Sequence, residues 1–218
     1  MTSFLDIRNA LGAATVYRRF QHFVSGNHYA RFVDDYLRPE AGQRILDIGC
    51  GPAAILEYLP DVEYVGVDIS PKYIDFARRR YGNRGQFHCR RVCETSLNEW
   101  GTFDLVIAHG IVHHLDDNEA SHLFQLAITA LNHPGRLVTL DGCFVEGQSR
   151  VARQLLVWDR GQHVRNEHSY RQLAQAFFPD IAVDVRSDLI RLPYTHIIMQ
   201  CYASSAIAER ATTRAHAA

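Results

Sequence analysis

The chain has 218 residues, of which 47% are hydrophobic, so it is long enough to bury the core of one domain. Its net charge of −1 gives no electrostatic reason to expect a nucleic acid or a membrane surface as a partner. No apolar run reaches the ~20 residues of a membrane span, and residues 1–10 lack the pattern of a secretory signal. The five cysteines are an odd number scattered along the chain, which predicts free thiols and a cytoplasmic location.

Apolar residues recur in a pattern of strands that alternate with helices. Residues 3–38 are predicted to form two helices. Five strands are then expected at Arg44–Ile48, 63–67, 86–91, 104–108 and 136–141, with helices at 53–59, 71–80 and 117–131 between them. After residue 141 the pattern predicts helices at 148–160 and 168–177, and two last strands at 181–186 and His196–Tyr202.

This alternation predicts βαβ units, and therefore a parallel sheet. We expect an α/β fold of the Rossmann-like, doubly wound type, with a mainly parallel seven-stranded sheet that ends in an antiparallel pair. Residues 1–40 are expected to form an N-terminal helical cap, residues 41–203 the ligand-binding domain, and residues 204–218 a flexible tail.

The stretch LDIGCGPAA (46–54) follows the first predicted strand and opens a helix. Its glycines allow a ligand to approach the backbone closely, and Ala54 completes the dinucleotide fingerprint G-x-G-x-x-G/A, which makes an NAD(P)-dependent oxidoreductase one interpretation. Two features disfavour a bound pyrophosphate: Pro52 lacks an N–H donor, and Asp47 adds a negative charge. Both features suit a nucleoside that carries an ammonium, such as S-adenosylmethionine, which has no phosphate.

Asp68 stands at the end of the second predicted strand, 17 residues after Gly51. An acidic side chain at this place can accept hydrogen bonds from both ribose hydroxyls of a bound nucleoside. The alternative is that Asp68 caps the following helix, although Ser70 is the better candidate for that cap.

Four segments, ILDIGCG (45–51), VEYVGVDIS (62–70), FDLVIAHGIVHHLDD (103–117) and LNHPGRLVTLDG (131–142), follow one another in the order and spacing of class I S-adenosylmethionine-dependent methyltransferases. The resemblance covers about residues 40–145. Two later segments, DRGQHVRNEHSYRQL (159–173) and RLPYTHIIMQC (191–201), resemble more loosely the end of bacterial small-molecule methyltransferases. The resemblance implies S-adenosylmethionine as cofactor, residues 41–203 as the methyltransferase domain, and a role in bacterial secondary metabolism.

The resemblance also implies which residues contact the cofactor. They are Asp47, Gly49 and Gly51 at the methionine end, Asp68 at the ribose, Ile69 and Val92 at the adenine, and Ala108 and His109 near the methionine moiety and the transferable methyl group. Two positions depart from the family. Ala53 replaces the third glycine of G-x-G-x-G, which is acceptable if its φ is negative, and Arg91 stands where an aspartate often receives the adenine amino group, so that Glu94 or the backbone would replace it.

The candidate catalytic residues are His109, His113 and His114, which follow the fourth predicted strand. An imidazole suits deprotonation of a hydroxyl acceptor, and we therefore expect oxygen rather than nitrogen or carbon to accept the methyl group. The alternative is that these histidines pack at a helix start, and no motif of metal ligands accompanies them, so no metal is predicted.

Tyr17, Arg165 and Tyr194 are expected to line the acceptor pocket, although packing roles are equally open for them. The expected partner is a small-molecule acceptor, and the expected state is a monomer or homodimer. Two further functions stay open: the NAD(P)-dependent oxidoreductase, and a methyltransferase-like protein that uses the cofactor for structure or for a reaction other than methyl transfer.

Overall fold

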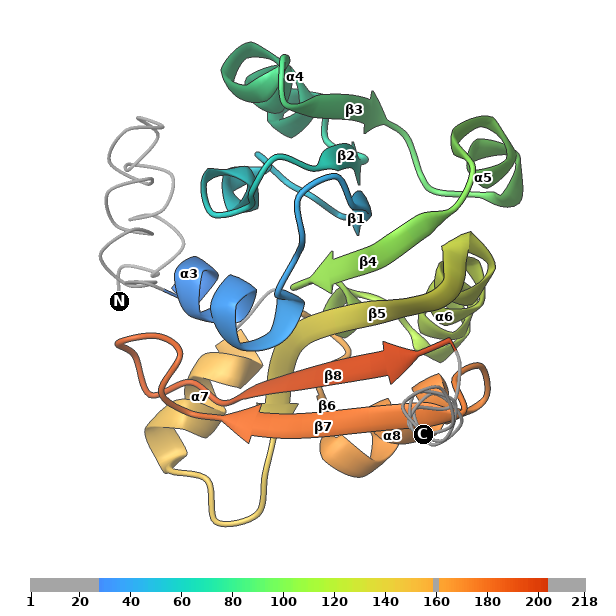
Figure 1. Ribbon diagram of the computed structural model, residues 1–218. Coiled ribbons are helices and arrows are strands. Elements are labelled where there is room, and N and C mark those ends of the chain that lie inside the picture. The colour runs from blue at the N-terminus through green and yellow to red at the C-terminus, as the bar shows by residue number, and fades with distance from the viewer. Residues whose placement is uncertain (1–27, 159–160, 204–218) are drawn as a thin grey trace, which may run out of the picture.

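The computed structural model describes residues 28–158 and 161–203, which form a central sheet with helices on both faces (Figure 1). The sheet order is β3-β2-β1-β4-β5-β8-β7, and a short β6 pairs with β5 beside this path. The strands are β1 Arg44–Ile48, β2 Glu63–Asp68, β3 Gly85–Cys89, β4 Phe103–His109, β5 Leu131–Phe144, β6 Arg165–Asn166, β7 Asp180–Arg186 and β8 His196–Tyr202.

Strands β1 to β5 run parallel, and β8 lies antiparallel between β5 and β7. The predicted α/β fold with a mainly parallel sheet is therefore confirmed, and the described residues add the two-residue β6 to the seven expected strands. The carboxyl ends of the central strands β1, β4 and β5 meet at one edge, which is where ligands bind in sheets of this topology.

The helices are α3 His28–Phe32, α4 Pro71–Tyr81, α5 Glu94–Trp100, α6 Asp117–Ala130, α7 Arg150–Trp158 and α8 Glu167–Gln175, with a π-helical turn η1 Val33–Leu37 and 3₁₀ turns η2 Ala54–Glu57 and η3 Val112–His114. The sequence pattern missed α5 and β6. Of the expected N-terminal cap, residues 1–27 with Tyr17 lie outside the described residues, as does the expected tail 204–218.

The expected helix over 53–59 is wrong, because the chain makes a 3₁₀ turn there. Ala53 adopts φ 55° and ψ 34°, in the left-handed region, so a regular helix cannot start through it. The negative φ that would make alanine acceptable at position 53 is therefore not present. The methyl group of Ala53 is fully buried in the core. Its packing there offsets part of the cost of a backbone conformation that favours glycine.

Two apolar clusters lie on the two faces of the sheet, which is what doubly wound topology requires. Alternate residues of one strand point to opposite faces: Ile197 and Met199 of β8 join the cluster with α6 and α8, whereas Ile198 joins the cluster with η1 and α4. Phe124 of α6 is fully buried against the first face. The two-sided core leaves the strand ends as the place for polar chemistry.

Candidate active site

The loop after β1 contains three residues with positive φ, namely Gly49, Gly51 and Ala53. Gly49 and Gly51 have φ of 77° and 54°, which favour glycine. A Cβ at position 49 would lie 2.7 Å from Cδ1 of Ile111, whereas a Cβ at position 51 would meet no described atom within 4 Å. Gly49 is therefore required by packing as well as conformation, and the backbone at Gly51 borders open space that a ligand could occupy.

Asp68 at the end of β2 organises this loop. Its Oδ2 accepts a hydrogen bond from the Gly51 amide at 3.0 Å, and its Oδ1 accepts one from the Ser70 amide at 2.7 Å. Ser70 is the N-cap residue of α4, with Pro71 at the first helical position as predicted, and its side chain makes no capping bond among the described residues. Each oxygen of Asp68 has a second lone pair, which leaves acceptor capacity for two hydroxyls.

Of the two expected adenine contacts, Ile69 directly follows Asp68 in the chain. Ile69 is 66% exposed, which is unusual for a large apolar side chain at a strand end and suits a flat ligand face. Val92 is half-buried and packs on the core. Arg91, the departure from the family pattern, pairs with Glu119 of α6 at 3.3 Å, so its guanidinium serves the protein surface.

Asp47 in β1 is buried at 3% exposure. Its Oδ2 accepts a hydrogen bond from the Tyr64 hydroxyl at 2.6 Å, and its Oδ1 has no hydrogen-bond partner among the residues that the structure describes. Burial raises the pKa of this carboxyl to about 7; the Tyr64 bond opposes the rise and Asp68 adds to it. A buried carboxylate oxygen without a donor fits an ammonium ligand such as the methionine end of S-adenosylmethionine, which could supply one.

Asp47→Asn is expected to stabilise the ligand-free protein at pH 8 but not at pH 4. Unfolded Asp47 ionises near 3.8 and folded Asp47 near 7, so the folded state binds the extra proton and stability falls as pH rises between these values. The gain should reach about 4 kcal/mol at most, and it should disappear towards pH 4. Urea unfolding followed by circular dichroism at both pH values measures it. Parallel pH profiles for the two proteins would show that Asp47 is not the titrating group.

His109, at the end of β4, lies against α3. Its Nε2 is 3.2 Å from Nε2 of His28, and its ring packs on Tyr29 and Phe32 with centroids 5.2 and 5.3 Å apart. Burial lowers the pKa of His109 to about 3 and that of His28 to about 4. Both imidazoles are therefore neutral near pH 7, and His109 is a poor base there, although its predicted place beside the cofactor's methyl group stays open.

His113 forms a buried pair with Asp141 at the carboxyl end of β5. His113 Nδ1 lies 2.7 Å from Oδ1 of Asp141, and the His113 amide donates to the same oxygen at 3.1 Å. Burial raises the pKa of Asp141, and the bonds from His113 oppose that rise. The carboxylate fixes the orientation of the His113 ring and favours the tautomer that carries its proton on Nδ1.

The third candidate histidine, His114, is exposed, with its ring 4.2 Å from that of His113. Within residues 28–158 and 161–203, no group of three or more histidine, cysteine or acidic residues could hold a metal ion. Ala108, next to His109 in β4, is fully buried, so its side chain belongs to the core at the edge of this site.

Arg165 uses its guanidinium inside the protein. It donates to Asp117 at 2.7 and 2.9 Å and to the carbonyl oxygens of Val112, Leu115 and His163, so it clamps the turn that carries His113. These bonds give Arg165 a supporting role that its predicted pocket-lining role did not include.

Tyr194 precedes β8, with its ring 4.7 Å from that of His196, and its hydroxyl lies 2.4 Å from where a Cβ on Gly142 would be. It therefore stands beside the carboxyl end of β5.

Two site residues were missed at the sequence level. Asp141 lies at the end of the fifth predicted strand, and a carboxylate at a strand end was a signal available for it. His28 lies 81 residues from His109 in the chain, and the sequence around His28 does not predict their contact.

The fold, the glycine loop, and the acidic residues at the ends of β1 and β2 have the pattern of a nucleoside-binding α/β domain. Residues 45–135 match the family described as "Methyltransferase domain". Within these residues the match confirms the resemblance to class I S-adenosylmethionine-dependent methyltransferases and the cofactor that the motifs predicted.

Two curated relatives illustrate the range of similar proteins. A phosphoethanolamine N-methyltransferase of Triticum aestivum is 28% identical over 197 residues, covering 85% of this chain and 38% of the relative. An O-methyltransferase (cnsE) of Penicillium expansum is 35% identical over 127 residues, covering 54% and 45%. The chain therefore spans under half the length of these relatives.

Solved structures share the fold. The N-methyltransferase NodS of Bradyrhizobium japonicum, solved with S-adenosylhomocysteine, matches with a TM-score of 0.65 at 13% identity, covering 91% of this chain and 97% of that one. At this identity the likeness shows the fold alone. In the part of the chain that is described here, no helix has the length and apolar character to cross a bilayer.

Proposed function

We propose that this protein transfers the methyl group of S-adenosylmethionine to a small-molecule acceptor, with oxygen favoured as the accepting atom. The observation that carries the cofactor assignment is Asp47, whose buried and unsatisfied oxygen lies beside the Gly49–Gly51 loop. Asp68, which faces the same loop, is the proposed ribose acceptor. Ile69 and Val92 are proposed to line the adenine, and Ala108 and His109 the methionine end.

S-adenosylmethionine supplies an electrophilic methyl group on a sulfonium, and the protein has to orient the acceptor and exclude water. A hydroxyl acceptor must also lose its proton while its oxygen attacks the methyl carbon. We assign that proton to Nε2 of His113, with Asp141 holding the ring and stabilising the imidazolium that forms. Arg165 holds the turn in place. The C–S bond breaks with its electrons returning to sulfur, which leaves S-adenosylhomocysteine.

A nitrogen acceptor is the second candidate, and the observation that favours it is the name of the wheat relative, a phosphoethanolamine N-methyltransferase. A neutral amine attacks with its own lone pair and needs a base less than a hydroxyl does. The buried His113–Asp141 pair is therefore the reason to rank oxygen first. The five free cysteines support a reducing, cytoplasmic setting, and biosynthesis of a small molecule remains the proposed role.

Calorimetric titration with S-adenosylhomocysteine tests the cofactor assignment. Binding with a Kd in the micromolar range or below is expected, and NAD should give no heat at the same concentration. Folded protein that shows no heat with S-adenosylhomocysteine at several hundred micromolar would overturn the proposal. Heat with NAD instead would favour the oxidoreductase. Binding without turnover of any offered hydroxyl or amine would favour a non-catalytic use of the cofactor.

A further inference from the structure

The helical segment formed by α3 and η1 (residues 28–37) covers His109. His28, Tyr29 and Phe32 surround the His109 ring from this one segment. Since His109 ends β4 at the carboxyl edge of the sheet, the segment forms one wall of the proposed methyl-donor pocket. The position of this wall decides how closed that pocket is.

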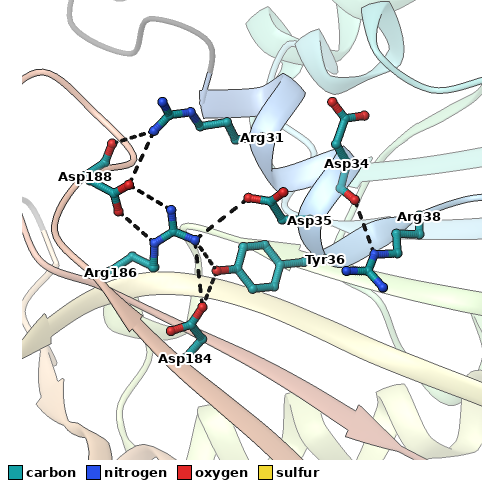
Figure 2. Close-up of polar contacts among 8 residues, drawn as sticks. All are labelled: Arg31, Asp34, Asp35, Tyr36, Arg38, Asp184, Arg186 and Asp188. Atoms are coloured by element: carbon teal, nitrogen blue, oxygen red, sulfur yellow. Dashed lines mark hydrogen bonds and ion pairs between the residues drawn. The ribbon is translucent and has the colours of Figure 1, made fainter.

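The far side of the segment is tied to β7 and to the loop after it by a network of charged groups (Figure 2). Arg186 donates to both carboxylate oxygens of Asp188 at 2.7 and 2.8 Å, and Arg31 donates to the Asp188 carbonyl at 3.0 Å. The Tyr36 hydroxyl donates to Asp184 and accepts a bond from Arg186 at 3.0 Å. We call these five residues the latch.

The latch has the features by which a network of surface charges contributes measurably to stability. Isolated exposed ion pairs contribute little, but a bidentate arginine within a network of several charges is an exception. The Tyr36 side chain is buried, and the Arg186 side chain is 27% exposed. Hydrogen bonds from Arg186 lower the pKa of Asp188 to about 2, so this carboxylate stays charged throughout the neutral range.

The latch joins two walls of the pocket. Asp188 belongs to the loop 187–195 that also carries Tyr194 and leads into β8, whose first residue His196 is close enough to His109 to lower its pKa further. Arg31 stands one helical turn after His28. Releasing Asp188 would therefore loosen α3 and this loop together.

The two halves of the segment are held differently. Phe32 and Leu37 are fully buried, and Arg136 donates to the Leu37 carbonyl, so the later half stays in the core without help from charges. In the first turn Arg31 is exposed and Tyr29 is half-buried, and the latch reaches that turn through Arg31. His28 is buried against His109, so the latch supports this turn beside that contact, whereas the core alone anchors the later half.

We propose that Arg186 and Asp188 are positioning residues, which hold the first turn of α3 closed over His109 and thereby set the affinity of the cofactor pocket. The inference rests on the proposed function, because the pocket it orders is the methyl-donor pocket. The latch residues do not touch the reacting atoms, and they act through His28 and Tyr29.

The test compares Asp188→Asn with Glu63→Gln. Each variant removes one exposed carboxylate that pairs with arginine. Asp188 pairs with Arg186 and, at 3.5 Å, with Arg31, whereas Glu63 pairs with Arg44 at the opposite, amino end of the sheet. In Asp188→Asn, hydrogen exchange of the amides in residues 28–32 should speed up at least about tenfold, and the pKa of His109 measured by NMR should rise from about 3 towards its ordinary 6.5. The Kd for S-adenosylhomocysteine should rise about tenfold. Glu63→Gln should change none of these.

The two proposals fail separately. Unchanged exchange and an unchanged His109 titration in Asp188→Asn would refute the latch, even if S-adenosylhomocysteine binds the wild-type protein well. Wild-type protein without S-adenosylhomocysteine binding would refute the proposed function, while exchange and titration would still decide on the latch. Arg186→Lys keeps the charge and loses the two-pronged contact, so it should lie between wild type and Asp188→Asn. Equal effects for Asp188→Asn and Glu63→Gln would mean that charge loss acts through general stability.

Discussion

Asp141→Asn is expected to lower kcat by about 10²–10⁴-fold for a hydroxyl acceptor while the Kd for S-adenosylhomocysteine stays within about threefold. The asparagine can still bond to His113 Nδ1, so the fold should survive. It can no longer stabilise a positive imidazole, and its amide can reverse the tautomer so that Nε2 carries the proton. Because Oδ1 of Asp141 lies 2.7 Å from Nδ1 of His113, the substitution acts directly on this imidazole.

Single-turnover methyl transfer followed by mass spectrometry measures this effect once an acceptor is in hand, and nitrogen NMR of the His113 ring reports the tautomer without one. His113→Ala should lose as much activity as Asp141→Asn, and the double variant should lose little more, because the two residues act as a unit. His114→Ala is the matched control, since its ring is adjacent but exposed. A large loss of activity in His114→Ala, with none in His113→Ala, would show that His113 is not the base and would point to His114 instead.

Asp68→Ala is expected to weaken S-adenosylhomocysteine binding by about 10–100-fold if both ribose bonds are lost. The structure adds a reason beyond those bonds. The same carboxylate accepts from the amides of Gly51 and Ser70, so its removal also frees the loop that would touch the methionine end. Asp68→Asn keeps two polar positions and should lose less, since one oxygen becomes an NH₂ group that cannot accept.

Calorimetry gives the Kd for each variant. Asp75→Ala is a suitable control, because Asp75 lies in α4 near Asp68 in sequence and its carboxylate pairs weakly with Arg78 at 4.0 Å on the surface. An affinity for S-adenosylhomocysteine in Asp68→Ala equal to that of Asp75→Ala would remove Asp68 from the site.

Most strands were predictable because they are short apolar runs, which need no distant partner to be recognised. β1 and β8 begin and end where the pattern placed them. The 53–59 helix failed for a different reason. Helical composition is a weak preference, and the left-handed backbone at Ala53 is imposed by the loop that must turn after β1.

Parts of the candidate site could be predicted for a similar reason. Asp47, Gly49 and Gly51 lie within five residues, and Asp68 follows at the end of the next strand, so one βαβ unit brings them together. That Asp47 is buried against Tyr64 with one oxygen unsatisfied, however, depends on the packing of two strands. The local sequence contains no measure of that burial.

The amino-acid sequence by itself determined the class of fold, the succession of most strands along the chain and the enzyme class, because periodicity and contiguous motifs are local properties of the chain. The tertiary structure decided that His113 has a carboxylate partner, that His109 is held neutral by burial against His28, and that Arg186 ties η1 to the β7–β8 loop. These contacts join residues 28 to 150 positions apart. Burial and charge at such contacts arise from how the elements pack, and residue type alone does not encode them.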